Sequence, residues 1–261
     1  MKKKKIITIA LIAAFSLCAV FTGMMAYWQW NDGQQSKDDF SALAELVAEE
    51  PAAPEQTPAP TDEPEAEPDE RELAYEKYKA LYEQNNDFVG WITIDGTAIN
   101  YPVMQSIGSP DYYLKHNFEK AYSDYGVPYV DEACAVGLSA NTVVYGHHMK
   151  NGTMFSSLVN YADKAYFDEH TVIRFDTIYG LGEYQVIAAF SFDTNNETFR
   201  YNEFADGTEA QFNEYVAECM ARRAYDTGFT SEYGDKLLTL STCEYTHTNG
   251  RFVVVTKLIT E

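Results

Sequence analysis

Two β-prone runs near the C-terminal end of the chain place the strongest limit on its fold. The stretch from Lys236 to Ile259 reads KLLTLSTCEYTHTNGRFVVVTKLI, with apolar and β-branched residues on both sides of a short polar segment. Such runs predict two strands joined by a loop. Cys243 then ends the first strand and Arg251 begins the second. If the strands are neighbours, the two side chains face each other across the mouth of the loop.

Further strand signals recur along the chain and predict a mostly β domain. The turn at Asp95-Gly96 joins two β-rich runs, as in a hairpin. Other short strands are expected near Tyr129 and over residues 142–145, 171–175, 184–192, 237–240 and 252–259. Short strands separated by turns predict a closed or nearly closed, antiparallel-rich barrel. Apolar residues at helical spacing predict one helix over residues 208–225, before the cysteine strand, and another ahead of the barrel.

Histidine follows one of these strands directly. The strand over residues 141–145 ends at a glycine, after which come His147 and then His148, which points elsewhere if the backbone stays extended. Histidine, cysteine and arginine thus stand at strand ends, where a rigid scaffold places chemistry. A lone cysteine after a strand is more often an inert residue. Cys243 is therefore a candidate nucleophile only together with His147 and Arg251.

The segments around these residues resemble class B sortases. They are TLSTC ending at Cys243, Arg251 eight residues later, and YGHHMKNGTMF over residues 145–155. The similarity extends from Asp87 to Ile259 and includes FVGWITI, NYPVMQ and YGVPYVD. Class B sortases are membrane-anchored cysteine transpeptidases of Gram-positive bacteria. The resemblance implies a sortase-like closed β-barrel of about eight strands, with N-terminal helices and a helix before the cysteine strand.

The resemblance also implies a role for each reactive side chain. Cys243 would be the nucleophile, His147 the acid and base, and Arg251 the ligand of the substrate carbonyl or its oxyanion. The implied reaction cleaves a C-terminal sorting signal resembling NPxT-G/N/S after threonine and transfers the acyl group to an amine of peptidoglycan or its lipid-linked precursor. No metal or other cofactor is implied. Further substrate contacts are implied for Asn100, Met104, Tyr145, Ser241 and Glu244.

Charge and cysteine spacing argue against other classes of protein. The formal net charge is -21, and no basic stripe is present to neutralise the phosphates of a nucleic acid. The cysteines at positions 18, 134, 219 and 243 lack the CxxC spacing of a zinc cluster. Cys134 and Cys219 are either small apolar residues or a disulfide pair, because the sequence does not give the distance between them.

The N-terminal part predicts a membrane anchor and a tether. Four lysines precede an uncharged run over residues 6–28, which as a helix spans about 34 Å and crosses a hydrocarbon core. The lysines favour a cytoplasmic N-terminus and an extracellular remainder. A cleaved signal peptide is the alternative, although the run exceeds the usual apolar length. The acidic, proline-rich composition that follows predicts an extended tether, with a short amphipathic helix over residues 38–50 as an option before it.

The predicted organisation combines these segments in one single-pass membrane protein. Its parts are a cytoplasmic basic tail (1–5), a transmembrane anchor (6–28), an acidic Pro-rich extracellular tether (29–70), an N-terminal helix of the catalytic domain (71–87) and a sortase β-barrel catalytic domain (88–261). Its expected partners are secreted proteins bearing a C-terminal sorting signal, and its expected role is to anchor them to the cell wall. Two alternatives remain open: a membrane-anchored cell-wall cysteine peptidase or hydrolase, and a non-enzymatic surface module.

Overall fold

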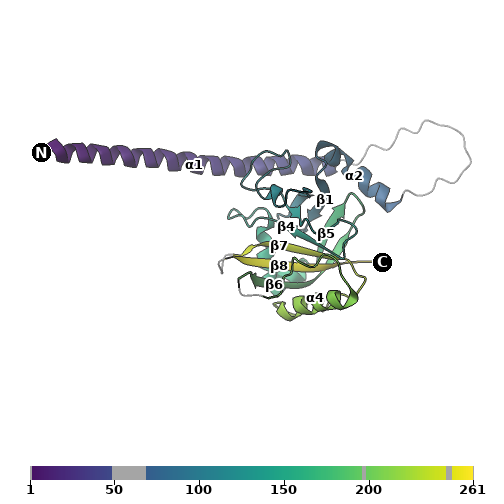
Figure 1. The fold of residues 1–261 in the computed structure, drawn as a ribbon. Helices are drawn as coiled ribbons and strands as arrows, with labels where there is room; N and C mark the ends of the chain where they lie inside the picture. The colour runs from purple at the N-terminus through teal and green to yellow at the C-terminus, as the bar shows by residue number, and fades with distance from the viewer. Residues whose placement is uncertain (1, 49–68, 196–197, 245–248, 261) are drawn as a thin grey trace, which may run out of the picture.

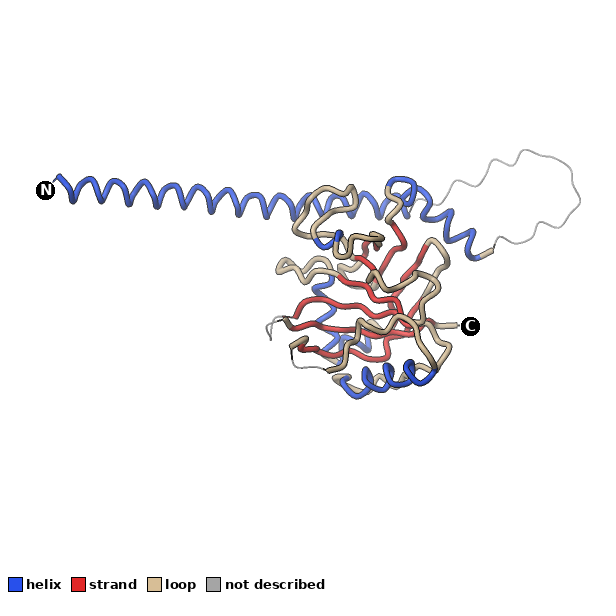
Figure 2. The backbone as a smooth tube through the Cα atoms, viewed as in Figure 1, coloured by secondary structure: helices blue, strands red, loops and turns tan. Residues whose placement is uncertain are grey.

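Eight strands in the described residues close into a barrel (Figures 1 and 2). The computed structural model describes residues 2–48, 69–195, 198–244 and 249–260. The strand order is β1-β2-β3-β4-β7-β8-β6-β5, and β5 pairs with β1 to close the barrel. The strands are β1 (Phe88–Thr93), β2 (Asn100–Met104), β3 (Tyr129–Val130), β4 (Asn141–Tyr145), β5 (Val172–Thr177), β6 (Glu183–Asp193), β7 (Leu237–Glu244) and β8 (Gly250–Leu258).

The barrel confirms the expected fold class, and most of its strand pairs are antiparallel, as expected. The hairpin of β1 and β2 is antiparallel, as predicted from its Asp-Gly turn. The pairs β2/β3 and β4/β7, however, are parallel, so the sheet is mixed. The helical elements are α1 (Lys2–Ala48), α2 (Glu70–Gln84), η1 (Tyr112–Leu114), η2 (Phe155–Ala162), α3 (Lys164–Glu169) and α4 (Glu209–Arg222).

Both faces of the sheet formed by β6, β7 and β8 are covered. Successive side chains on a strand point to opposite faces. Leu238 and Leu240 belong to the main core cluster, whereas Val253 and Val255 belong to an outer cluster beneath α4. Residues 237, 239, 241 and 243 therefore share the outer face of β7, which α4 covers only in part. A pocket opens on this face, at the end of the strand that carries Cys243.

Helix α4 begins where the sequence pattern predicts a helix before the cysteine strand. Thr208 and Gln211 form a capping box, in which each side chain bonds the backbone of the other residue. Tyr215, on the buried side of α4, shares a hydrogen bond of 2.9 Å with Thr239 on β7. The helix is thus fixed to the outer face of the strand that leads to Cys243.

Helix α1 is longer than the predicted anchor. It runs unbroken to Ala48, and Figure 1 shows its C-terminal part lying along the domain. Phe40 and Leu43 are buried there, with the Phe40 ring edge-on to Tyr101 at 5.0 Å between centroids. The carboxylate of Asp32 accepts hydrogen bonds of 3.0 Å from Ser123 Oγ and from the amide of residue 124.

The predicted tether over residues 29–70 therefore needs correction in its first half. Residues 29–48 are helical because apolar side chains at helical spacing find a buried face on β2, which composition alone does not reveal. Residues 49–68 lie outside the described part of the chain. Among the described helices, one is suited by length and composition to crossing a membrane: α1 holds an apolar window of mean hydropathy 2.4 with 0% buried.

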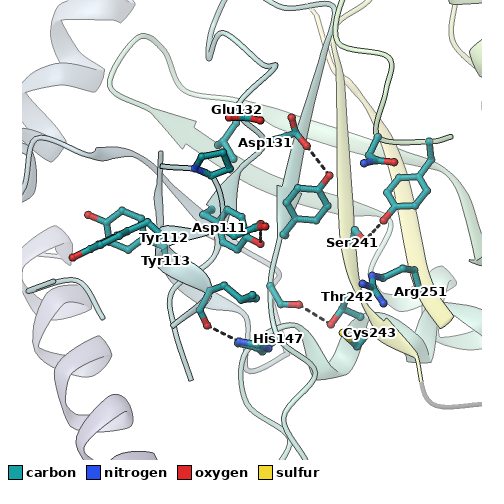
Figure 3. A pocket seen from close by; sticks show the side chains of 18 of the residues that line it. Asp111, Tyr112, Tyr113, Asp131, Glu132, His147, Ser241, Thr242, Cys243 and Arg251 are labelled. Carbon is teal, nitrogen blue, oxygen red and sulfur yellow. Dashed lines mark hydrogen bonds between the residues drawn. The ribbon is translucent and has the colours of Figure 1, made fainter. Parts of the chain in front are cut away.

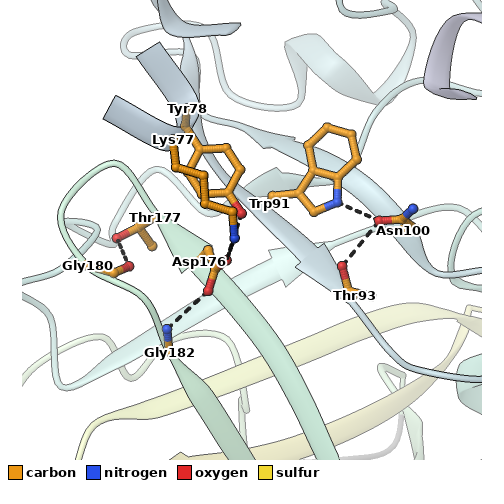
Figure 4. Close-up of polar contacts among 9 residues, drawn as sticks. All are labelled: Lys77, Tyr78, Trp91, Thr93, Asn100, Asp176, Thr177, Gly180 and Gly182. Carbon is orange, nitrogen blue, oxygen red and sulfur yellow. Dashed lines mark hydrogen bonds and ion pairs between the residues drawn. The ribbon is translucent and has the colours of Figure 1, made fainter. Parts of the chain in front are cut away.

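Helix α2 packs against the barrel through a polar contact and an apolar stripe. Ala74, Tyr78 and Leu81, at helical spacing, are buried. Lys77 Nζ and the Tyr78 hydroxyl both contact one carboxylate oxygen of Asp176 on β5, each at 2.7 Å (Figure 4). The helix expected ahead of the barrel is thus packed into the core of the barrel domain.

Candidate active site

A pocket of about 440 Å³ lies where β4 and β7 end and β8 begins, on the outer side of the barrel. Figure 3 shows His147, Cys243 and Arg251 at one end of this pocket and Asp131 and Glu132 at the other. The segment from Ser106 to Leu114 contributes much of the facing wall. Three side chains that are far apart in the sequence therefore share one groove.

Cys243 and Arg251 are direct partners in the antiparallel ladder of β7 and β8. The carbonyl of Ser241 accepts a hydrogen bond from the amide of Gly146 at 3.1 Å and therefore points toward β4. Because the direction of the backbone N–H and C=O groups alternates along a strand, those of Cys243, two residues later, also point toward β4 and away from β8. Cys243 and Arg251 consequently form a non-hydrogen-bonded pair, in which Cα atoms are about 4.5 Å apart and side chains are close. The thiol and the guanidinium therefore emerge side by side.

The parallel pairing of β4 with β7 places His147 near the same point. Tyr145 is opposite Ser241 in this ladder, and His147 and Cys243 each lie two residues further on. A Cβ on Gly146 would lie 2.5 Å from the ring of Phe155, so this position requires glycine or a shift of the ring. The Thr242 hydroxyl donates to the Gly146 carbonyl at 2.8 Å and ties the two strand ends together.

The His147 imidazole is held by a backbone carbonyl. Its Nε2 donates to the oxygen of Leu114 at 2.7 Å, since a carbonyl only accepts. In the neutral ring, Nδ1 is then the nitrogen that accepts a proton. Burial lowers the pKa of His147, and the nearby Lys115 acts in the same direction, while the Leu114 bond and Asp124 oppose the shift. The resting imidazole is therefore neutral at pH 7.

Tyrosine hydroxyls brace the walls of the pocket. Tyr145 donates to Asp131 Oδ2 at 2.7 Å, and the Tyr201 hydroxyl bonds Ser241 Oγ at 2.8 Å. Sequence reasoning did not single out Tyr201 or Asp131. Asp131 does lie in the YGVPYVD segment that carries the family resemblance, whereas Tyr201 lies in an irregular segment with no periodic signal. Only the fold brings Tyr201 to the cysteine strand.

The structure holds the remaining cysteines apart from this pocket. Cys134 and Cys219 are buried free thiols and are not joined in a disulfide. In the part of the chain that the structure describes, no group of three or more His, Cys, Asp or Glu side chains is placed to hold a metal ion. Besides the Cys243 thiol, the His147 imidazole and the Arg251 guanidinium, the charged side chains that line the pocket are those of Asp111, Asp131, Glu132 and Arg200.

Comparison with known proteins identifies the family. The model of the sortase domain family matches residues 92–259, which is more than half of the chain. The chain belongs to the sortase family. Sortase B of Staphylococcus aureus is 33% identical over 186 residues, covering 70% of this chain and 75% of that protein. Sortase B of Listeria monocytogenes is also 33% identical, over 71% of this chain and 75% of its own length.

Solved structures place this sortase in class B. A Staphylococcus aureus sortase B–substrate complex superposes with a TM-score of 0.70 at 26% identity, covering 88% of this chain and 98% of that one. A sortase B complexed with triglycine superposes with a TM-score of 0.72 at 27% identity, covering 87% and 99%. The protein is thus a class B sortase, a cysteine-type transpeptidase.

The predicted substrate contacts of this sortase separate into two groups. Tyr145 and Ser241 line the pocket. Met104 is fully buried in the core, and Asn100 accepts a hydrogen bond from Trp91 Nε1 at 2.6 Å (Figure 4) and lines a different cavity, beside α1. Neither of these two reaches the sortase pocket, because β2 is separated from β4 by β3. Glu244 is the last residue of β7, and its side chain lies outside the described part.

The lowered pKa of His147 predicts a specific pH dependence of stability. Between the usual value of 6.5 and the lower folded value, the unfolded chain binds more protons, so stability falls as pH drops through this window. Replacing His147 with glutamine should remove this contribution, which for one proton is at most about 1.4 kcal/mol per pH unit. Urea unfolding of both proteins between about pH 7.5 and pH 5 measures it. If the free energy of unfolding changed with pH equally in the wild type and in His147→Gln, this would contradict the expected burial of the neutral ring.

Proposed function

We propose that this sortase cleaves a C-terminal sorting signal after threonine and joins the new carboxyl group to an amine of peptidoglycan or its lipid-linked precursor. In this proposal Cys243 is the nucleophile, His147 is the acid and base, and Arg251 binds the reacting carbonyl oxygen. The register of Cys243 with Arg251, in the pocket that His147 also lines, carries the proposal. Secreted proteins with a signal resembling NPxT-G/N/S are the proposed clients.

The first half of the reaction forms a thioester. The neutral imidazole of His147 takes the thiol proton, and the Cys243 sulfur attacks the threonine carbonyl carbon. Negative charge develops on the carbonyl oxygen, where the guanidinium of Arg251 stabilises it. The carbon–nitrogen bond then breaks, and the leaving amine takes the proton from His147.

The second half transfers the acyl group to an amine. The incoming amine loses a proton to His147 and attacks the thioester carbon, after which the carbon–sulfur bond breaks and Cys243 leaves as a thiolate. The thiolate then takes this proton back from His147, which restores the starting thiol and neutral imidazole. Water competes as the slower acceptor. Two observations on relatives support this pair of substrates, because sortase B structures have been solved with a substrate and with triglycine.

The proposed location is the outer face of the cell membrane. Helix α1 would cross the bilayer once, with the lysine-rich N-terminus in the cytoplasm and the barrel outside. Tyr145 and Ser241 are proposed substrate contacts because both line the pocket next to the reactive groups. A substrate contact of Glu244 stays a prediction, which is based on its position next to Cys243 in the sequence.

Product analysis with and without an added amine tests the proposed function. The full chain in detergent is incubated with a peptide that contains an NPxT-type signal, first alone and then with triglycine. We expect free acid in the first case and the triglycine adduct in the second. Free acid alone in both cases would favour a cell-wall peptidase, and no turnover of any x-Pro-x-Thr-x peptide would favour a non-enzymatic surface module.

A further inference from the structure

The second histidine of the His147-His148 pair contacts the backbone of the candidate nucleophile. His148 Nδ1 donates to the carbonyl oxygen of Cys243 at 2.9 Å, and the ring is half-buried. The two neighbouring rings therefore hold different backbone carbonyls, since His147 bonds Leu114. From the sequence alone, His148 has no role beyond that of a neighbour pointing elsewhere.

This bond stands where the parallel ladder of β4 and β7 stops. The amide of Gly146 donates to Ser241, and continuing the ladder would bring the amide of residue 148 to the carbonyl of Cys243. The chain instead leaves β7 after Tyr145: the carbonyl of His147 accepts from the amide of Phe155, and His148 pairs with Met154. The imidazole N–H of His148 takes the place of the backbone amide that would form the next hydrogen bond of the ladder.

Strand β7 therefore has a neighbour on each side at Cys243, the residue that carries the sulfur. On one side, Cys243 pairs with Arg251 on β8. On the other side, β4 has ended, and the ring of His148 supplies the hydrogen bond that the Cys243 carbonyl would otherwise lack within this ladder. A small displacement of a reacting atom is costly, since misplacement by about 1 Å can lower a rate about 100-fold.

We propose that His148 is a positioning residue that fixes the backbone of Cys243, and with it the sulfur, relative to Arg251 and His147. This inference rests on the proposed function, in which Cys243 is the nucleophile. His148 acts through a hydrogen bond to a main-chain carbonyl, and it exchanges no proton with substrate. An N–H donor at that position is therefore sufficient, and a titrating ring is not required.

Three variants of the full chain in detergent separate these roles. His148→Ala removes the donor, His148→Asn retains a side-chain N–H near the position of Nδ1, and His170→Ala serves as the matched control. His170 also donates through Nδ1 to a carbonyl, that of Tyr166 at 2.8 Å, but it lies outside the pocket. Thermal unfolding of each variant reports whether the fold is retained.

We expect kcat to fall in His148→Ala and to be largely restored in His148→Asn. We expect His148→Ala to lower kcat for acyl transfer about 10- to 100-fold with KM changed little, because misplacement of the sulfur affects the transition state. His148→Asn should recover most of this loss, and His170→Ala should leave kcat unchanged. Unchanged kcat in His148→Ala would overturn the proposal. Equal loss in both His148 variants would also overturn it, because the ring itself would then be needed.

A second readout does not depend on catalysis. Cys243-Glu244 is the one Cys-Glu step in the sequence, so labelling with carbonyl-¹³C cysteine and ¹⁵N glutamate gives a single NMR correlation for the Cys243 carbonyl. Its ¹³C shift should move in His148→Ala and stay near the wild-type position in His148→Asn. An unmoved signal in His148→Ala would overturn the contact. Failure of the proposed function is seen separately, as retained transfer by Cys243→Ala.

Discussion

Cys243→Ala should lose both cleavage of the sorting peptide and transfer to triglycine. Without the sulfur no thioester forms, and removal of a nucleophile typically lowers turnover by several orders of magnitude. Because alanine is smaller and Cys243 is only partly buried, the fold should persist. Chromatographic quantification of the acid and adduct, with unfolding temperature as a control on folding, measures the effect.

Labelling with a thiol-directed vinyl sulfone tests the reactivity of Cys243 independently of turnover. Burial raises the pKa of Cys134 to about 11 and that of Cys219 to about 12, so these thiols stay protonated and unreactive near neutral pH. Within the barrel domain, peptide mapping should therefore find the label on Cys243. Cys18→Ala, an exposed position on α1, is the matched control and should retain full activity. Transfer activity that survives in Cys243→Ala would refute the assigned nucleophile.

Arg251→Ala should lower kcat/KM about 10²- to 10³-fold, the usual cost of removing one donor to a developing oxyanion. The guanidinium stands beside the thiol in the β7/β8 register, and one of its N–H groups donates to the Gly250 carbonyl at 3.0 Å. This bond orients the side chain, and a guanidinium has five N–H donors in all, so that others can bind a substrate oxygen in the pocket. Steady-state cleavage of the sorting peptide measures the loss.

The comparison with lysine tests whether geometry or charge matters at this position. Arg251→Lys keeps the positive charge but lacks the planar fork of donors, so only part of the activity should return. Arg174→Ala is a suitable control, because that side chain is exposed and pairs with Asp95 away from the pocket. A loss of less than about threefold in Arg251→Ala would remove this residue from the oxyanion role, given the usual magnitude.

Periodicity and local motifs were sufficient for most of the fold. β-branched and apolar runs indicated the strands, since strand side chains alternate and sheets with both faces covered are apolar throughout. The Asp95-Gly96 turn predicted the β1/β2 hairpin, and the helix before the cysteine strand appears as α4. The parallel pairs were not predicted, because pairing partners that are distant in the chain leave no local signal.

The predicted substrate contacts show where local reasoning reaches its limit. Tyr145 and Ser241 lie in the pocket because they are two residues before His147 and Cys243 on parallel strands. Asn100 and Met104 share a motif with the family, yet their side chains face Trp91 and the core. The irregular segment that carries Tyr201 was overlooked, since nothing in its composition indicates which strand it meets.

The amino-acid sequence by itself determined the kind of chemistry, the family and the order of strands and helices, because these follow from residue types and short-range spacing. Tertiary structure alone decided three things: that β4 runs parallel to β7, that α1 continues onto β2, and that the His148 ring meets the Cys243 carbonyl. Each joins segments separated by tens of residues. Such contacts depend on the closure of the whole barrel, in which every strand's position is set by its two neighbours.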